Sequence, residues 1–430
     1  MKTTLGTLTL ILIQLFLIQA VFSQGLPTAK PEEVGMSSDR LNRINTVMQS
    51  YVDENILPGL ITMVARRGKI VHFEKYGMMD IDRPMQFNTI FRIASMTKPI
   101  TSVAVMMLYE EGHFQLYDPI SKYIPEFKDL KVFSSTDENG LKLIDQNNQI
   151  TIINLLTHTA AINRGSGITP QELIVDSLYK QIDYRNGTLK DMTYKIAKIP
   201  LLYQPGTKWS YSNASANVLA HLVEVISDKP FNEFLEERIF IPLNMKDTDF
   251  YVPEEKINRF AALYGPSENS DIEVIEKPDT SAMSTPPKFH SAAGGLVSTV
   301  TDYAIFAQML LNKGEFNGTR LLGRKTVEFM TQNHLSEELL PIEMIARRGE
   351  MKYNLIPGMG FGLGFGVTID IPKSYKLASM GRFGWGGSFT TDFWVDQEEE
   401  IIGILMSQFS PSQHYYDHGF WGLVYQAIVD

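Results

Sequence analysis

The spacing of apolar residues changes along the chain and predicts different elements in different parts of it. From 37 to 52 apolar side chains recur every three or four positions, and Ser37 or Ser38 is suited to cap the helix that this pattern predicts. The next stretch, "LITMVARRGKIVHFEKYG", is rich in β-branched residues and predicts two strands joined by a tight turn at Arg67-Gly68. A helix followed by a β-hairpin is therefore expected first.

Helical spacing dominates the middle of the chain. It runs from Ser95 to about Gly112, and Pro-rich, polar and helical segments alternate from there to about Phe289. A strong helix is expected over Ala214 to Ser227, and another between a cap at Thr301 and a stop at Gly314. This part is predicted to be mostly α-helical.

Strand patterns return near the C-terminus. Two β-rich runs meet at Asp396 to Glu400, before a last helix near Tyr415 to Val429. With strands at both ends, the economical arrangement is an α+β fold, in which one antiparallel sheet is flanked by helices and interrupted by an inserted all-α lobe. The expected boundaries are about 30–92 and 292–430 for the α/β lobe, and about 93–291 for the helical lobe.

The first residues have the pattern of an export signal. One positive charge at Lys2 precedes the apolar run "LTLILIQLFLIQAVFS", and cleavage after Ala20 or Ser23 satisfies the preference for a small residue. We therefore expect a signal peptide over 1–23 and a mature domain over 24–430, in the periplasm or secreted from a bacterium. The alternative, an uncleaved membrane anchor, would need a longer run less broken by glutamine.

The composition limits the classes of partner that the protein is expected to bind. At 430 residues, with 44% hydrophobic and 11% aromatic side chains, the chain can bury a large core. It has no cysteine, which excludes disulfides and a thiol nucleophile. The net charge is −10 and the basic residues are scattered, so neither nucleic acid nor an anionic membrane is an expected partner. The substrate must therefore be argued from individual residues.

Several common site motifs are missing. The eight histidines form no His-Glu-x-x-His pair, so no zinc site is predicted. The glycines over 358–366 do not match the G-x-G-x-x-G register of dinucleotide sites. "GGSFT" has Thr390 where a nucleophile elbow needs glycine. No cofactor and no metal is therefore expected.

A serine and a lysine remain as candidate chemistry. Ser95 and Lys98 are three positions apart at the start of an apolar helix, so their side chains share one face. A serine hydroxyl needs a base, and burial can depress a lysine pKa enough to supply one. The alternative is a capping serine with a solvated lysine. The same spacing recurs at Ser177 and Lys180, so the spacing alone carries little weight.

Tyr-x-Asn also occurs twice. Tyr184 to Asn186 lies in a polar turn, whereas Tyr211 and Asn213 stand between a Pro-Gly turn and a strong helix, where a loop can present them to a substrate. A phenol whose pKa is lowered by a nearby ammonium can relay a proton, and the amide can hold the lysine or the substrate. The alternative is a buried tyrosine whose hydroxyl is merely satisfied.

The stretch "GRFGWGGSFTTDFWVD" is the third candidate. Its glycine-rich turn, Trp385-Gly386-Gly387, enters a predicted strand and lets the backbone approach a ligand closely. A backbone N–H there can serve as an oxyanion donor. The alternative is a glycine turn with Trp385 as packing.

Taken in this order, the three motifs resemble those of serine β-lactamases and penicillin-binding proteins. Longer stretches of the sequence resemble the class C β-lactamase-like family, which includes family VIII carboxylesterases. The similarity spans about Lys30 to Ala427. The stretches that carry it include "FRIASMTKPIT", "LLTHTAAI", "PGTKWSYSNAS" and "AAGGLVSTVTDYAIFAQMLLN".

The resemblance implies roles for individual residues. It implies that Ser95 is the acylated nucleophile, that Lys98 accepts its proton and that Tyr211 is the partner base. Asn213 would contact Lys98 or the substrate, and the N–H groups of Ser95 and Ser388 would form the oxyanion hole.

Departures from the family pattern bear on substrate. Trp385 stands where relatives have a lysine or histidine, whose cation attracts a substrate carboxylate, so ester hydrolysis is favoured over β-lactam hydrolysis. Ala161 stands where relatives usually have glycine. The alternatives left open are a β-lactamase, a D-amino-acid peptidase or carboxypeptidase, and a non-turnover protein that binds a cell-wall ligand.

Overall fold

The computed structural model describes most of the chain after the predicted signal. The described residues are 25–138, 140–162, 170–182, 187–267, 271–344, 354–412 and 414–430. The signal peptide predicted over 1–23 lies outside them, and so does the match at Tyr184 to Asn186.

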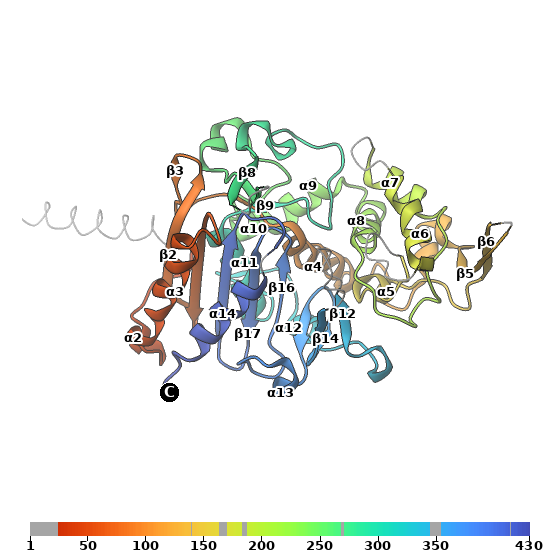
Figure 1. Cartoon of the computed structure of the whole chain (residues 1–430). Helices are drawn as coiled ribbons and strands as arrows, with labels where there is room; N and C mark the ends of the chain where they lie inside the picture. Colours follow the sequence, from red (N-terminus) through yellow and green to blue (C-terminus); the bar gives the residue numbers. More distant parts are fainter. Residues whose placement is uncertain are drawn as a thin grey trace, which may run out of the picture.

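Strands from the two ends of the chain form one antiparallel sheet (Figure 1). Eight strands of the described residues belong to it. In spatial order they are β14 (Met359–Phe361), β15 (Gly366–Thr368), β16 (Phe383–Gly387), β17 (Thr391–Asp396), β18 (Ile401–Ser407), β1 (Gly59–Arg66), β2 (Lys69–Asp80) and β3 (Arg83–Pro84). This confirms the predicted α+β class, with a sheet built from both ends.

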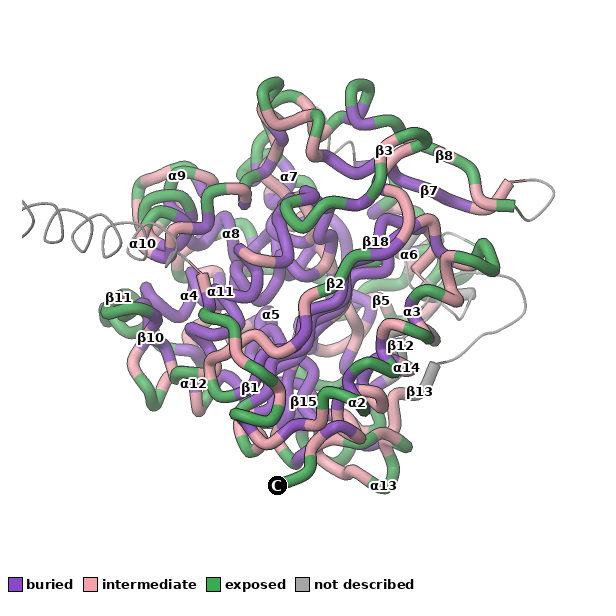
Figure 2. The backbone as a smooth tube through the Cα atoms, turned by 90° about the vertical axis from the view of Figure 1, so that its left-hand side faces the viewer, coloured by how far each residue is buried: buried purple, intermediate pink, exposed green. Residues whose placement is uncertain are grey.

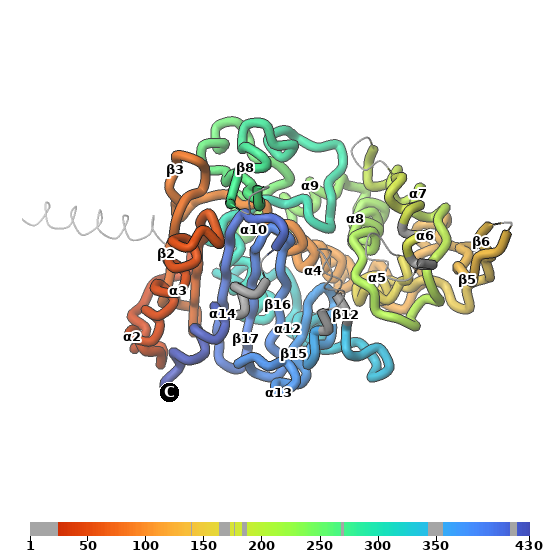
Figure 3. The backbone as a smooth tube through the Cα atoms, viewed as in Figure 1, coloured from red at the N-terminus to blue at the C-terminus, as the bar shows by residue number. Residues whose placement is uncertain are grey.

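The first and last strands of the chain meet in the middle of this sheet. Leu60 on β1 pairs with Ser407 on β18, and the two strands lie side by side in Figure 3. Arg67 and Gly68, at φ 51° and 72°, make the predicted turn between β1 and β2, because left-handed backbone at both positions suits a two-residue hairpin. Every residue of β1 is buried, as expected for a strand covered on both faces (Figure 2).

Helices from both termini cover one face of the sheet. They are α2 (Ser38–Leu41), α3 (Arg43–Asp53) and α14 (His414–Tyr425). The single helix predicted after Ser37 is in fact two, separated at Asn42, whose N–H bonds back to Ser38 and Arg40 and closes the first turn. Ser37 caps the first of them by accepting the Arg40 N–H. On this face Ile44 and Met48 share a core with Trp394.

The other face packs against α4 (Thr97–Glu110) and α11 (Val300–Leu311). The predicted cap at Thr301 is wrong: Thr299 caps α11, and its side chain accepts the Asp302 N–H. This shift places Val300, which is buried, in the first turn of the helix.

A mostly helical region lies between α4 and α11 in sequence. Its helices are α5 (Ile152–Leu156), α6 (Pro170–Lys180), α7 (Leu189–Ile196), α8 (Asn213–Ser227), α9 (Phe231–Leu235) and α10 (Ile241–Leu243). It also contains two β-hairpins, formed by β5 (Lys131–Asp137) with β6 (Gly140–Asp145) and by β7 (Leu263–Pro266) with β8 (Ile272–Glu276). The lobe boundaries near 93 and 291 stay a prediction.

Further short strands and α-helices lie along the described chain. They are β4 (Phe91–Arg92) with β9 (Val297–Ser298), β10 (Glu315–Phe316) with β11 (Thr319–Arg320), β12 (Ile342–Met344) with β13 (Asn354–Ile356), α12 (Arg324–Met330) and α13 (Ile371–Ser374). Within these described ranges, no helix is long and apolar enough to cross a bilayer.

Candidate active site

Ser95 lies in a short turn between β4 and α4. The turn is the 3₁₀ helix η2 (Ala94–Met96), and the serine is half-buried. Ala94 just before it has φ 44°, in the left-handed region that residues other than glycine seldom adopt. Such a conformation persists only where neighbouring groups hold it in place.

Three neighbours hold this turn. A Cβ added to Gly387 would lie 2.5 Å from the Ile93 carbonyl oxygen, so β16 approaches the turn as closely as glycine allows. A Cβ on Gly294 would lie 3.3 Å from the carbonyl carbon of Ala94. The Tyr303 hydroxyl donates to the Met96 carbonyl at 2.8 Å. Together they fix the direction of the Ser95 side chain.

Lys98 is buried in the first turn of α4, with 3% of its surface exposed. Its Nζ lies 3.2 Å from Ser95 Oγ, 2.8 Å from Asn213 Oδ1 and 2.7 Å from the Ala293 carbonyl oxygen. Burial lowers the Lys98 pKa well below its usual value of 10.5, because a charge in a dry site loses its hydration.

The three oxygen contacts can be made by either protonation state of Lys98. An ammonium donates to all three oxygens, whereas a neutral amine donates to Asn213 and Ala293 and turns its lone pair toward the Ser95 hydroxyl. The lowered pKa favours the neutral amine, so the site suits a base.

Tyr211 and Asn213 flank Ser212, the residue that caps the N-terminus of α8. Ser212 caps this helix by accepting the Ser215 N–H at 3.1 Å. Asn213 is thereby the first residue of the helix, and the Tyr211 ring lies 4.6 Å from Lys98 Nζ.

The prediction that an ammonium lowers the Tyr211 pKa is wrong. Burial raises the pKa of Tyr211 to about 12, against the opposing effect of hydrogen bonds with Ser95 and Trp385. The effect of burial is larger because phenolate loses more by desolvation than the phenol does. Tyr211 is therefore a protonated phenol at rest.

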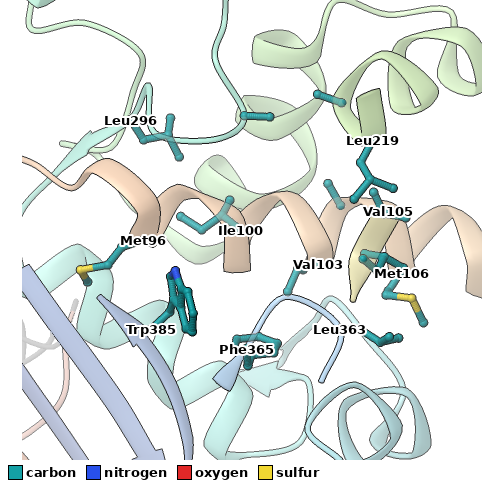
Figure 4. Packing of buried hydrophobic residues seen from close by; sticks show 14 of the residues in the cluster. Met96, Ile100, Val103, Val105, Met106, Leu219, Leu296, Leu363, Phe365 and Trp385 are labelled. Carbon is teal, nitrogen blue, oxygen red and sulfur yellow. The ribbon is translucent and has the colours of Figure 1, made fainter. Parts of the chain in front are cut away.

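Trp385 lies in β16 with its side chain against this phenol. Its Nε1–H donates to the Tyr211 hydroxyl at 3.1 Å, and the two ring centroids are 5.3 Å apart. Figure 4 shows the indole under α4, near Met96, Ile100 and Phe365. The interpretation of Trp385 as a packing residue therefore holds, because its ring is buried in the core. Its indole N–H in addition contacts Tyr211.

Gly386 and Gly387 are the last residues of β16, so the predicted order of turn and strand is reversed: the turn follows them and leads into β17. Ser388 begins that turn and is exposed. Within the described residues, neither the Ser95 nor the Ser388 backbone N–H donates to a backbone oxygen outside its own element.

The structure brings five of the predicted residues into one connected group and leaves the second Ser-x-x-Lys match apart. The group is Ser95, Lys98, Tyr211, Asn213 and Trp385. The second match, Ser177 and Lys180, is exposed on α6.

Two contributors were missed from sequence. The Ala293 carbonyl cannot be read from a side-chain pattern, since any residue carries one. His158, in "LLTHTAAI", is 4% exposed and its ring centroid lies 4.8 Å from that of Tyr211. A histidine inside an otherwise apolar and hydroxyl-bearing run was the only available signal. In the part of the chain described, no three His, Asp or Glu residues are grouped as metal ligands.

This fold and this group of residues are those expected of a serine hydrolase. The family described as Beta-lactamase matches residues 44–424, and the chain therefore belongs to the β-lactamase family of serine hydrolases.

Several curated relatives cover most of the chain. Protein Rv1367c of Mycobacterium tuberculosis is 33% identical over 371 residues, which are 85% of this chain and 89% of that protein. Esterase EstB of Burkholderia gladioli is 27% identical over 379 residues, with the same two coverages of 85% and 89%. A putative D-alanyl-D-alanine carboxypeptidase of Salmonella typhimurium is 28% identical over 395 residues, covering 85% and 82%.

Solved structures share the fold. EstCE1, described as a hydrolase with promiscuous acyltransferase activity, superposes with a TM-score of 0.74 at 22% identity, over 90% of this chain and 99% of its own. At this identity the likeness concerns the fold alone.

Proposed function

We propose that this protein hydrolyses carboxylic esters through an acyl-enzyme formed on Ser95. The observation that carries the proposal is the setting of Lys98 Nζ, whose two donors are taken by Asn213 and Ala293 while its third direction faces Ser95 Oγ at 3.2 Å. A buried neutral amine aimed at a serine hydroxyl activates that serine as the nucleophile that acyl transfer requires.

Acylation moves two protons. Lys98 takes the proton of Ser95 as the oxygen forms a bond to the ester carbonyl carbon, and the carbonyl oxygen becomes an oxyanion. When the C–O bond to the alcohol breaks, Tyr211 gives its phenol proton to the leaving oxygen. The high resting pKa of Tyr211, about 12, supports this role as donor, because the phenol is protonated when the substrate arrives.

Deacylation returns both protons. The Tyr211 phenolate, with the Lys98 ammonium 4.6 Å from its ring, takes a proton from water, and the hydroxide attacks the acyl carbon. The bond to Ser95 then breaks, the acid leaves and Lys98 returns its proton to the serine. The N–H groups of Ser95 and Ser388 are proposed to hold the oxyanion in both steps.

The uncharged side chain of Trp385 supports ester substrates over β-lactams and peptides, which carry a carboxylate. Its uncharged indole stands at the position where relatives carry a cation, and its one N–H is engaged by Tyr211. The naming of the relative EstB as an esterase agrees with this choice. The carboxypeptidase relative keeps D-amino-acid peptides as the second candidate, with β-lactams as the third.

Labelling tests the nucleophile. A fluorophosphonate probe is expected to modify Ser95, and mass spectrometry of the digest locates the adduct. Ser95→Ala is expected to abolish labelling, whereas Ser177→Ala is the matched control and is expected to label normally. Undiminished labelling of Ser95→Ala would exclude the assignment.

Parallel turnover assays test the substrate class. We expect short-chain p-nitrophenyl esters to be turned over at a higher kcat/KM than a chromogenic cephalosporin or a D-alanyl-D-alanine peptide. Faster lactam or peptide turnover would refute the ester assignment. A single stoichiometric acylation with no steady state would instead identify a binding protein.

We also propose export, which rests on the residues before the described chain. The apolar run behind Lys2 supports a cleavable signal. Intact-mass measurement of the protein from a bacterial periplasm or medium is expected to show a chain that starts after Ala20 or Ser23. A full-length chain in the membrane fraction would favour the anchor.

A further inference from the structure

His158 lies behind the Tyr211 loop and takes no part in the mechanism above. Its carbonyl oxygen accepts the Ser210 N–H at 2.8 Å, and its Nδ1 accepts the Ser212 N–H at 3.2 Å. These two donors come immediately before and after Tyr211. One residue therefore holds the backbone on both sides of the phenol.

The backbone of His158 is in an unusual conformation. Its φ of 58° lies in the left-handed region, where asparagine and aspartate are the residues best tolerated after glycine. This conformation lets the carbonyl and the side chain of a single residue serve two donors of the same loop. A conformation of this cost is kept where the surroundings require it.

The side-chain acceptor is needed because its donor is buried. Ser212 is 1% exposed, and a buried N–H without a partner is costly. Burial lowers the His158 pKa well below 6.5, so the imidazole is neutral near pH 7. Since the Ser212 amide must donate, Nδ1 is the acceptor and Nε2 carries the hydrogen.

We propose that His158 is a positioning residue for the reaction. Through Nδ1 it sets the Ser212 backbone, and with it the direction of Tyr211 on one side and the start of α8, with Asn213, on the other. This inference rests on the roles proposed above for Tyr211 and Asn213. We attribute the positioning of the Tyr211 loop to the acceptor atom Nδ1 of His158. The aromatic ring of His158 also contacts Tyr211 and Phe361, but the positioning is not attributed to these contacts.

Two substitutions separate the acceptor from the ring. His158→Asn and His158→Gly both tolerate the left-handed backbone and both remove the ring, but only asparagine keeps an acceptor on the γ carbon. On a p-nitrophenyl ester, His158→Asn is expected to keep kcat within about fivefold of the parent. His158→Gly is expected to lose about 10²-fold in kcat with little change in KM, the size typical of a misplaced catalytic group.

Thermal unfolding of both variants gives the structural control. Both are expected to lose stability, because both lose the ring contacts, and activity is expected to follow the acceptor instead. Equal activity of two folded variants, whether high or low, would overturn the proposal. If His158→Gly does not fold, His158→Asn decides alone: a folded variant with about 100-fold lower kcat would exclude the acceptor role.

A third measurement separates failure of this inference from failure of the proposed function. Hydrogen exchange at the Ser212 amide, followed by mass spectrometry, is expected to accelerate in His158→Gly and not in His158→Asn. If Ser95 resists the fluorophosphonate probe but exchange still separates the variants, the proposed function fails and the positioning holds. If Ser95 is labelled and exchange is the same in both variants, the positioning fails alone.

Discussion

The two Ser-x-x-Lys segments of this chain have the same spacing and opposite surroundings. Ser95 precedes α4 in a 3₁₀ turn, and Lys98 is buried with three polar partners. Ser177 and Lys180 lie within α6, where both side chains are exposed and the Ser177 hydroxyl donates to the Ile174 carbonyl at 2.6 Å.

This difference shows that the Ser-x-x-Lys spacing alone does not specify a catalytic pair. Three residues of separation bring a serine and a lysine to one helix face in both segments. At Ser95 the fold adds burial, which depresses the Lys98 pKa, and acceptors that orient the amine. The chemistry thus depends on groups from α8 and from the loop at Ala293, far away in sequence.

The largest expected effect comes from removing each lysine in turn. Lys98→Met keeps the length of the side chain but removes the base, and ester turnover is expected to fall by about 10³- to 10⁴-fold. Lys180→Met is expected to change kcat/KM by less than about twofold, as for most exposed substitutions. Similar losses in both variants would break the comparison.

A second test removes the phenol oxygen next to Ser95. Tyr211→Phe keeps the ring under Lys98 but transfers no proton, so kcat is expected to fall by about 10²-fold or more. Steady-state kinetics on a p-nitrophenyl ester measure this. A kcat equal to that of the parent would refute the role given to Tyr211.

The pH profile tests whether Lys98 acts as a neutral base. Asn213→Asp places a carboxylate where Oδ1 lies 2.8 Å from Nζ, and an opposite charge raises the pKa of an amine by about 1–3 units. Because the base must be unprotonated, the acid limb of kcat/KM is expected to move to higher pH by a similar amount. Lys180→Met serves as control, with an unshifted limb, and a shift to lower pH in Asn213→Asp would contradict the assignment.

A smaller effect is expected from the indole N–H. Trp385→Phe removes the donor to Tyr211 and is expected to cost about 2- to 12-fold in kcat, the worth of one neutral hydrogen bond. Trp209→Phe is the matched control, because that ring also stacks on Tyr211 while its Nε1 has no partner within the described residues. A larger loss in the control would assign the effect to packing.

The smallest effect concerns stability. Ala161 has φ 61°, a left-handed conformation that glycine adopts without strain. Ala161→Gly removes about 1–2 kcal/mol of strain from the left-handed backbone of the folded protein. Part of this gain is lost, because glycine increases the conformational entropy of the unfolded chain. We expect a net gain of about 0.5–1 kcal/mol in the free energy of unfolding by denaturant titration, with unchanged kcat. A loss of stability would show that the methyl group packs favourably.

Long periodic segments could be predicted from the sequence. The hairpin at Arg67-Gly68, the two strands meeting at Asp396 to Glu400 and the helix over Ala214 to Ser227 are confirmed, because each pattern reflects burial of a whole face. The ends of elements were less reliable. Thr299 instead of Thr301 caps α11, since several nearby residues are suited to cap and packing selects among them.

The sequence predicted only those parts of the candidate site that can be recognised from the identity of a side chain. The order of the three motifs indicated which Ser-x-x-Lys to prefer. The carbonyl of Ala293, the left-handed backbone of His158 and the raised pKa of Tyr211 were not predictable, because each depends on what the completed fold places around that residue.

The pairing of β1 with β18 has a consequence for the order of folding. The first long strand to leave the ribosome is completed by one of the last, so the sheet depends on contacts between distant parts of the chain, which form slowly. Until residue 401 is available, one edge of "GLITMVAR" has no partner, and an apolar strand with a free edge favours aggregation. A chain truncated before β18 would therefore be expected to precipitate rather than to form a smaller enzyme.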